Sequence, residues 1–200
     1  MQLEPTIYIV DDDEDLRHSV CFLVELAGLT AKMCASANEF LQEYDPAKPG
    51  CLLVDVHMPG MSGLELQALL KTKQLSLPVI IITGNADVQM AVQAMKVGAL
   101  DFIEKPLDND LLLARIRDCI NVSKNAYNQH LRQEESATRL ASLTQREREV
   151  MELLVQGKLN KVIAADLGIS PRTVEIHRAN IMQKLQARSL SDVVKIALMH

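Results

Sequence analysis

Three apolar runs in the first half of the chain constrain its fold more than any other feature. They read TIYIV at 6–10, CLLVDV at 51–56 and PVIIIT at 78–83. Short runs without polar alternation are typical of strands buried on both faces, as in parallel sheets covered by helices. Weaker strand candidates lie at 31–35 and 101–105. The runs therefore predict a sheet of five strands.

Segments with helical periodicity alternate with these runs. They occupy 13–27, 37–44, 62–73, 86–97 and 108 onward. Gly28 fits a helix stop, and Ser62 fits an N-cap before the apolar residues of GLELQALL. Five successive strand–helix units predict an α/β domain at residues 1–120, with a doubly wound, five-stranded parallel sheet.

Residues with carboxylate, hydroxyl or ammonium groups lie where the predicted strands end. They are Asp11, Asp12, Asp55, Thr83 and Lys105. Parallel sheets bind ligands at this edge. Adjacent carboxylates repel unless a cation intervenes, and an oxygen-only site with one or two carboxylates suits Mg²⁺. Asp55 could accept a phosphoryl group, while Lys105 neutralises its oxygens and Thr83 donates a hydroxyl.

Charge divides the chain into two parts. Residues 1–124 carry 18 Asp and Glu against 10 Lys and Arg, whereas residues 125–200 carry 8 against 11. This asymmetry suggests an acidic module joined to one that meets nucleic acid. The sequence has no apolar stretch near the roughly 18 residues of a membrane span and no signal-peptide pattern. With four scattered cysteines, it predicts a cytoplasmic protein with reduced thiols and no membrane partner.

Short helices are the only elements predicted beyond residue 142. Thr144 and Glu147 have capping-box spacing, Asn160 is expected to cap the next helix, and Ser170 with Pro171 opens a third. A fourth helix is expected at 191–199. The pattern predicts an all-α, four-helix domain with a helix-turn-helix at 142–200. Residues 121–141, polar and without Gly or Pro, are expected to form a helical linker, with a flexible coil as the alternative.

The third short helix has two distinct faces. At 100° per residue, the core face holds Val174, His177, Ile181 and Leu185, and the opposite face holds Arg172, Ile176, Ala179 and Gln183. An outward isoleucine suits a DNA major groove, where it can contact a thymine methyl group. Arg172, Glu175, Ile176 and Ala179 are expected to reach bases, and Thr173 and Lys158 to reach phosphates. His177 is expected to be buried and hydrogen-bonded, and Arg178 to make either a phosphate contact or an internal ion pair.

VDDDEDLR, Asp55 with MPGMSG, IITG and DFIEKP together resemble the receiver domain of bacterial two-component response regulators. The resemblance implies that a sensor histidine kinase phosphorylates Asp55. It also implies that Asp12, Asp55 and the His57 backbone carbonyl hold Mg²⁺, with Asp11 acting through water. Thr83 and Phe102 would form the switch pair, Lys105 would pair with the phosphate, and the Lys105–Pro106 bond would be cis.

LTQREREV, NKVIAADLGIS and TVEIHRANIMQKL resemble the LuxR/NarL-type helix-turn-helix. A receiver followed by this module is identified as the FixJ/NarL subgroup of response regulators. The resemblance implies a transcription activator of aromatic-hydrocarbon (styrene-like) catabolism that acts with RNA polymerase on double-stranded DNA. It further implies a homodimer after phosphorylation. The partner-facing residues of the receiver would be Val88, Val92 and Lys96, with Met95 either there or in the core. Because the second half of the chain has a charge balance of only +3, two copies should be needed to bind DNA, and Val193, Val194 and Ala197 in the last helix are the expected pairing surface.

Two other functions remain open. A phosphohydrolase of the haloacid dehalogenase type would use Asp55 as nucleophile, but it carries a second Asp where this chain has His57, and the chain lacks a cap domain. A binding module with a receiver that is never phosphorylated is disfavoured, because this chain has a suitable residue at every position of the receiver motif that carries chemistry. A switch that is not an enzyme is therefore the leading hypothesis.

Overall fold

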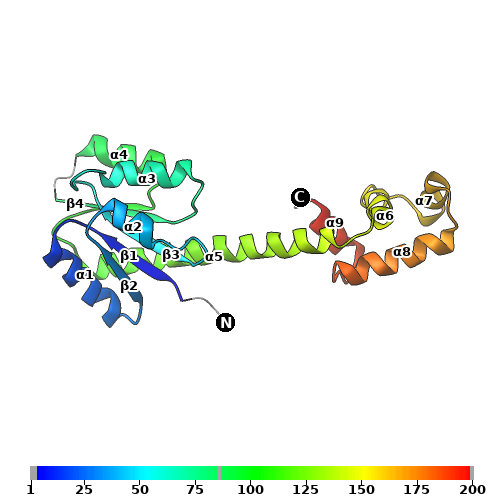
Figure 1. The fold of residues 1–200 in the computed structure, drawn as a ribbon, viewed down its shortest axis with the longest axis horizontal. Helices are drawn as coiled ribbons and strands as arrows, with labels where there is room; N and C mark the ends of the chain where they lie inside the picture. Colours follow the sequence, from blue (N-terminus) through cyan, green and yellow to red (C-terminus); the bar gives the residue numbers. More distant parts are fainter. Residues whose placement is uncertain (1–3, 85–86, 199–200) are drawn as a thin grey trace. The chain divides into compact units, whose positions relative to one another are not determined.

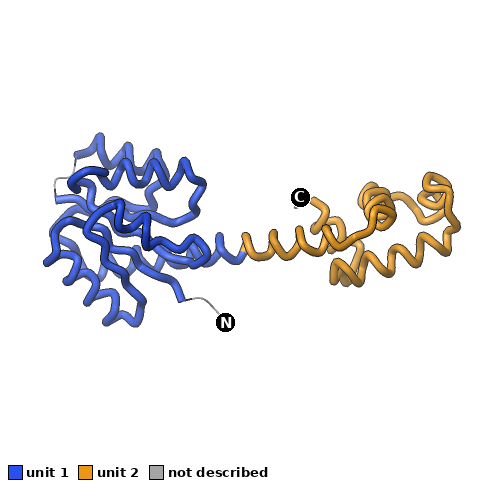
Figure 2. Tube along the Cα trace, in the orientation of Figure 1, with its two compact units in different colours: residues 1–128 blue, residues 129–200 orange. Residues whose placement is uncertain are grey.

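The structure, a computed structural model, describes residues 4–84 and 87–198. The chain forms two compact units, residues 1–128 and 129–200 (Figure 2). The boundary between them falls inside one helix, α5 (Asn109–Ala141). Residues 121–141, for which helix and coil were both open, therefore lie in a helix.

The first unit is a parallel sheet whose strands alternate with helices (Figure 1). Its strands are β1 (Thr6–Val10), β2 (Thr30–Cys34), β3 (Gly50–Asp55), β4 (Val79–Thr83) and β5 (Asp101–Glu104). The helices between them are α1 (Glu14–Leu26), α2 (Ala37–Glu43), α3 (Gly63–Thr72) and α4 (Val88–Val97), and α5 follows β5. The strands are ordered β2-β1-β3-β4-β5, and every neighbouring pair is parallel. The predicted α/β class is confirmed.

Helices cover both faces of this sheet. On one face, Ile7 and Ile9 of β1 pack with α1 and α5, including Val24 and Ile116. On the other face, the alternate residue Tyr8 packs with α2, α3 and α4. Successive strand residues point to opposite faces, so a strand covered on both must be apolar throughout. This is why β1, β3 and β4 were readable as unbroken apolar runs.

Helix boundaries follow the capping signals in the first unit. Ser62 and Glu65 form a complete capping box at the start of α3, and Asp13 caps α1. Gly28 follows α1 with a positive φ of 75°. The range predicted for α4 began at residue 86, which lies outside the described residues. The Lys105–Pro106 bond is cis.

The second unit contains α6 (Gln145–Val155), α7 (Asn160–Leu167), α8 (Pro171–Lys184) and α9 (Leu190–Leu198), preceded by the end of α5. Their apolar faces enclose one core that includes Val150, Ile163, Val174 and Ile181. Thr144 and Glu147 form the predicted capping box. Residue 199 of the predicted last helix lies outside the described residues. Across residues 4–84 and 87–198, no helix has both the length and the apolar character needed to cross a membrane.

The predicted cap of α7 is wrong. Leu159 occupies the N-cap position and makes no side-chain cap hydrogen bond, while Asn160 is the first helical residue. The Asn160 side chain is engaged elsewhere, because its Oδ1 accepts a hydrogen bond from Arg178 Nη1 at 2.6 Å. This contact joins α7 to α8, and a local capping pattern could not reveal it.

Among the glycines of the first unit, Gly63 lies closest to neighbouring backbone. A Cβ atom there would lie 2.2 Å from the carbonyl oxygen of Asp55. Gly63→Ala should therefore destabilise this unit by about 1–3 kcal/mol, because rigid backbone must shift. Urea unfolding followed by near-ultraviolet circular dichroism measures the effect. Gly84→Ala is the control, since the nearest atom to a Cβ there is 3.9 Å away; equal losses in both variants would contradict the packing argument.

Candidate functional site

Asp11 and Asp55 face one ammonium group at the carboxyl edge of the sheet. Lys105 Nζ lies 2.9 Å from Asp11 Oδ2 and 2.7 Å from Asp55 Oδ1. Both carboxylates are buried, and the Lys105 side chain is 23% exposed. Three charges from β1, β3 and the end of β5 therefore meet where the sequence placed them.

Strand register brings these ends together. Val10 pairs with Val54, so Asp11 and Asp55 each follow a paired position. Asp55 pairs with Ile82, which places the buried Thr83 one residue further along β4. The backbone N–H of Lys105 donates to the Thr83 carbonyl at 2.8 Å. Phe102 is half-buried on β5 against the core of α2, α3 and α4.

Backbone amides complete the carboxylate contacts. His57 N–H donates to Asp55 Oδ2 at 2.5 Å, while the His57 side chain is exposed. Asp13 N–H donates to Asp11 Oδ1 at 2.9 Å. Asp55 is thus held through both oxygens, by an ammonium on one and an amide on the other.

Arg17 is part of this edge, although the sequence analysis did not select it. Its Nη1 donates to the Asp11 backbone carbonyl at 2.6 Å. An arginine in the first turn of a surface helix fits an ordinary solvated position, so no sequence pattern distinguishes it.

Burial and ion pairing act against each other in this cluster. Burial raises the pKa of the Asp11 carboxyl, although the hydrogen bond from Lys105 opposes the rise. Burial lowers the pKa of the Lys105 ammonium, but its hydrogen bonds to Asp55 and Asp11 outweigh this and leave the pKa raised. Both pKa values are therefore raised, but with opposite effects on charge: the rise favours the ammonium form of Lys105, which has two carboxylate partners, and disfavours the carboxylate form of Asp11, for which burial is the largest cause.

The acidic edge contains two clustered carboxylates rather than three. Asp12 is exposed, and within residues 4–84 and 87–198 no three His, Cys, Asp or Glu side chains lie close enough to hold one metal ion. The structure therefore does not gather Asp11, Asp12 and Asp55 into one group. Two carboxylates still match what Mg²⁺ takes from a protein, because it keeps several waters.

An apolar surface lies on α4. Val88 is 79% exposed, Val92 is 46% exposed, and Met95 and Lys96 are also exposed. Only Ala94 of this helix is buried. The alternative that Met95 packs in the core is wrong.

The outward face of α8 is as the sequence predicted. Arg172, Glu175 and Ala179 are exposed, and Ile176 is 56% exposed. Val174, Ile181 and Leu185 are fully buried on the opposite side. The Glu147 carboxylate, itself buried, accepts from Lys184 Nζ at 2.7 Å and ties the end of α8 to the start of α6. A rigid helix thus presents four side chains to the surroundings.

Three expectations for this unit need correction. His177 is half-buried, and its buried Nδ1 has no hydrogen-bond partner among the described residues. Arg178 makes an internal hydrogen bond to Asn160 rather than an ion pair. Val193 is 1% exposed in the core, so it cannot face a second chain; Val194 is half-buried. Val193 of α9 packs into the core of its own unit. An apolar helix face looks the same in the sequence whether it packs in the core or against a second chain.

The two residues predicted to reach phosphates have partners within the chain. Lys158 Nζ lies 2.7 Å from Asp166 Oδ2, with both side chains partly exposed. Thr173 Oγ1 lies 2.8 Å from Ser170 Oγ. To bind a DNA phosphate, Lys158 would have to leave Asp166, and Thr173 would have to leave Ser170.

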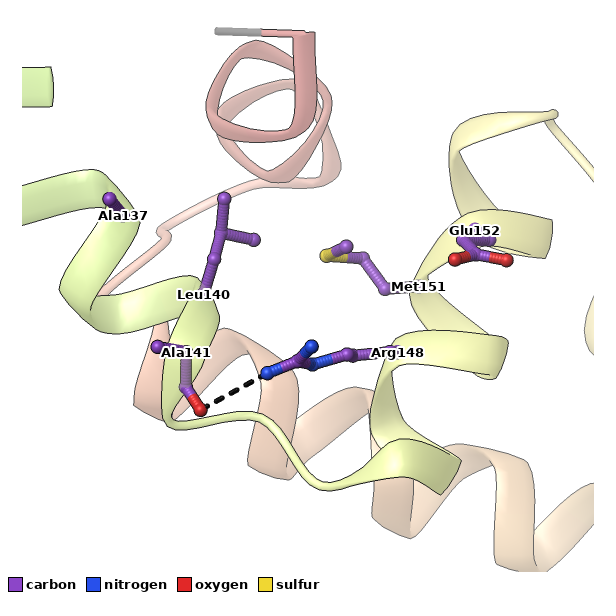
Figure 3. Close-up of a pocket in the computed structure, with 6 residues that line it drawn as sticks. All are labelled: Ala137, Leu140, Ala141, Arg148, Met151 and Glu152. Carbon is purple, nitrogen blue, oxygen red and sulfur yellow. Dashed lines mark hydrogen bonds between the residues drawn. The ribbon is translucent and has the colours of Figure 1, made fainter. Parts of the chain in front are cut away.

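An open pocket of about 320 Å³ lies in the second unit between α5 and α6 (Figure 3). Its lining is Ala137, Leu140, Ala141, Arg148, Met151 and Glu152. Leu140 and Met151 point toward each other across it, and Arg148 donates to the Ala141 carbonyl at 3.2 Å. Arg148 and Glu152 are exposed. The pocket has an apolar floor without a cluster of converging polar groups, so we assign it no ligand.

Comparisons with known proteins cover both units. Residues 7–117 match the response regulator receiver domain, and residues 141–197 match the bacterial regulatory proteins of the luxR family. The transcriptional regulatory protein FixJ of Azorhizobium caulinodans is 46% identical over 193 residues, which cover 96% of this chain and 92% of FixJ. The response regulator protein TodT of Pseudomonas putida is 39% identical over 190 residues, covering 95% of this chain and 84% of TodT. The solved structure of the response regulator StyR has a TM-score of 0.91 at 38% identity and covers 98% of this chain and all of that chain.

Proposed function

The chain belongs to the two-component response regulators with a LuxR-type DNA-binding domain, and we propose that phosphorylation of Asp55 by a sensor histidine kinase controls how it binds DNA. Members of this family regulate transcription. The observation that carries the proposal is the buried Asp55 carboxylate, held between the Lys105 ammonium and the His57 amide. We take residues 1–120 as the receiver, 121–141 as a helical linker and 142–200 as the DNA-binding domain.

Asp55 is placed to act as a nucleophile toward a phosphoryl group. One carboxylate oxygen attacks phosphorus, the bond to the phosphohistidine nitrogen of the kinase breaks, and an aspartyl phosphate forms. Lys105 neutralises a phosphoryl oxygen as a point charge, and the Thr83 hydroxyl donates to another. Inward burial of the Phe102 ring would follow, since a phenylalanine has no hydroxyl with which to signal.

Mg²⁺ is the cofactor that this donor set fits. Asp11 and Asp55 are buried carboxylates that already face one cation, and both are in contact with Lys105. We propose that Asp12, Asp55 and the His57 carbonyl would hold the ion directly, with Asp11 acting through water; this requires the exposed Asp12 side chain to turn toward Asp55. The bound ion supplies charge neutralisation for the transferred phosphoryl group.

Phosphorylation would act through dimerisation. Val88, Val92, Met95 and Lys96 give α4 an exposed surface suited to a second copy of the receiver. In the DNA-binding domain, Val194 and Ala197 of α9 remain candidates for pairing, whereas Val193 is excluded by burial. Two copies would bind half-sites about one helical turn apart, roughly 10 base pairs.

Helix α8 would enter the major groove with its N-terminal half. Arg172, Glu175, Ile176 and Ala179 would reach base edges, while Thr173 and Lys158 would bind phosphates, which position the protein without reading sequence. Bound in this way, the regulator would recruit RNA polymerase. We propose aromatic-hydrocarbon catabolism as the regulated process, and the likeness to StyR and TodT supports this proposal. Identifying the operator and the genes that it controls would test it.

Asp55→Asn should abolish phosphoryl uptake, because the amide lacks the nucleophilic oxygen charge. Incubation with acetyl phosphate and Mg²⁺, followed by mass spectrometry, should show one added phosphoryl group on the wild type and none on the variant. The exposed Asp110 offers the control, Asp110→Asn, which should behave as wild type. Uptake by Asp55→Asn at the wild-type rate would refute the assignment.

Val92→Asp should leave phosphorylation intact and abolish the phosphorylation-dependent dimer, because a charge would be buried in the apolar α4 surface. Val122 on α5 has the same 46% exposure and supplies the matched control, Val122→Asp. Sedimentation of both phosphorylated proteins measures the effect. The α4 surface is excluded if phosphorylated Val92→Asp still dimerises.

Ile176→Ala should cost on the order of 1 kcal/mol of DNA affinity and relax the preference at one thymine, since the methyl contact is lost. Lys158→Ala is the comparison: it should weaken all sequences alike and reduce the salt dependence by about one unit. Salt titrations against a library of operator variants separate the two effects. An unchanged sequence preference in Ile176→Ala would show that this face of α8 does not read bases.

A further inference from the structure

One buried polar side chain of the receiver plays no part in the site described above. Gln67, on α3, is 4% exposed. Its Nε2 donates to the backbone carbonyl of Ala94 on α4 at 3.0 Å. Its Oε1 is buried and has no hydrogen-bond partner among the described residues. A buried acceptor without a donor carries a free-energy cost, so its retention needs an explanation.

The acceptor of this bond lies at a structural junction. The Ala94 carbonyl also accepts from Gly98 N–H at 3.1 Å and Ala99 N–H at 3.0 Å. Gly98 is left-handed, with φ of 114°, and ends α4. Gln67 therefore holds the turn through which the chain passes from α4 into β5, the strand that carries Phe102 and leads to Lys105.

The other end of the connection reaches Asp55. Gly63 N–H donates to the Val56 carbonyl at 3.1 Å, and the Gly63 Cα packs so closely that a Cβ would lie 2.2 Å from the Asp55 carbonyl oxygen. Gln67 follows Gly63 by four residues and so lies on the same face of α3, one turn further along. Helix α3 thus joins the backbone of Asp55 to α4 in two short steps.

We propose that Gln67 is a positioning residue that couples Asp55 to α4 and holds α4 in the arrangement of the unphosphorylated protein. This inference rests on the proposed function. The orientation of the amide is fixed, because exchanging its oxygen and nitrogen would set two oxygens against each other. The bond to Ala94 is therefore made while Oε1 stays unpaired, so the hydrogen-bonding of Gln67 is incomplete in the unphosphorylated arrangement.

The α4 surface is the output of this coupling. Val92, Met95 and Lys96 are exposed on the helix whose buried residue is Ala94. A shift at the Ala94 carbonyl moves these side chains with the helix. Without the bond, α4 should reach the dimer-competent arrangement more readily, even when Asp55 carries no phosphoryl group.

Gln67→Met tests the coupling, because methionine is unbranched, similar in size and unable to donate to Ala94. The unphosphorylated variant should dimerise more tightly than wild type by roughly tenfold to hundredfold, the value of two hydrogen bonds, one lost in each protomer. The ratio between its unphosphorylated and phosphorylated dimer constants should fall by the same factor, while phosphoryl uptake stays at the wild-type rate. Sedimentation and intact mass give these quantities.

Leu70→Val is the matched control. Leu70 is buried one turn beyond Gln67 on α3, so this change perturbs the same core but keeps the hydrogen bond. A purely structural role for Gln67 predicts that both variants lose stability and that neither dimerises more tightly without phosphate. That result, or an unchanged ratio in Gln67→Met, overturns the proposal.

Hydrogen exchange in α4 separates this proposal from the proposed function. If the phosphorylated wild type does not dimerise, coupling still predicts that phosphorylation alters exchange in α4 of the wild type and alters it less in Gln67→Met. Equal changes in both proteins show that the coupling is wrong while Asp55 remains the acceptor. Absence of phosphoryl uptake by the wild type overturns both proposals.

Discussion

Two buried carboxylates that share one ammonium group set the terms for the rest of the receiver. Removing charges from water is costly, and Lys105 offsets that cost for Asp11 and Asp55 together. One positive charge between two negative ones leaves the cluster with a net negative charge, which is why a further cation suits it. A phosphoryl group on Asp55 adds negative charge and competes for Lys105. Any response to phosphorylation therefore begins with a redistribution of contacts at this ammonium.

The same geometry favours a switch over a hydrolase. In a phosphohydrolase of the haloacid dehalogenase type, an Asp two positions after the nucleophile acts as the general acid and base. Here His57 contributes its backbone N–H to Asp55, and its imidazole is exposed. The carboxylate is also buried, so water has limited access to an aspartyl phosphate. Both features favour a phosphoryl group that persists long enough to change a surface.

Much of the fold could be predicted because strands β1, β3 and β4 are buried on both faces and therefore appear in the sequence as unbroken apolar runs. The sheet edge was predictable for the same reason: parallel strands share one carboxyl end, so Asp11, Asp55 and Lys105 had to meet. Contacts between distant helices leave no such pattern. Asn160 was predicted to cap a helix but bonds to Arg178, and Val193 was predicted to lie on a pairing surface but closes the core. Side-chain type alone does not report which helix packs opposite.

Magnitudes decide how these parts divide the work of switching. Moving an equilibrium from 1:99 to 99:1 requires about 5.5 kcal/mol of differential stabilisation. A single hydrogen bond contributes about 0.5–1.5 kcal/mol, so Gln67 cannot be the switch itself. In the proposed switch, the larger share would come from charge-assisted contacts of the phosphoryl group with Lys105, Mg²⁺ and Thr83, which would form only after phosphorylation. Gln67 instead adjusts the free-energy difference between the unphosphorylated arrangement and the dimer-competent one. It thereby sets the fraction of unphosphorylated protein that dimerises.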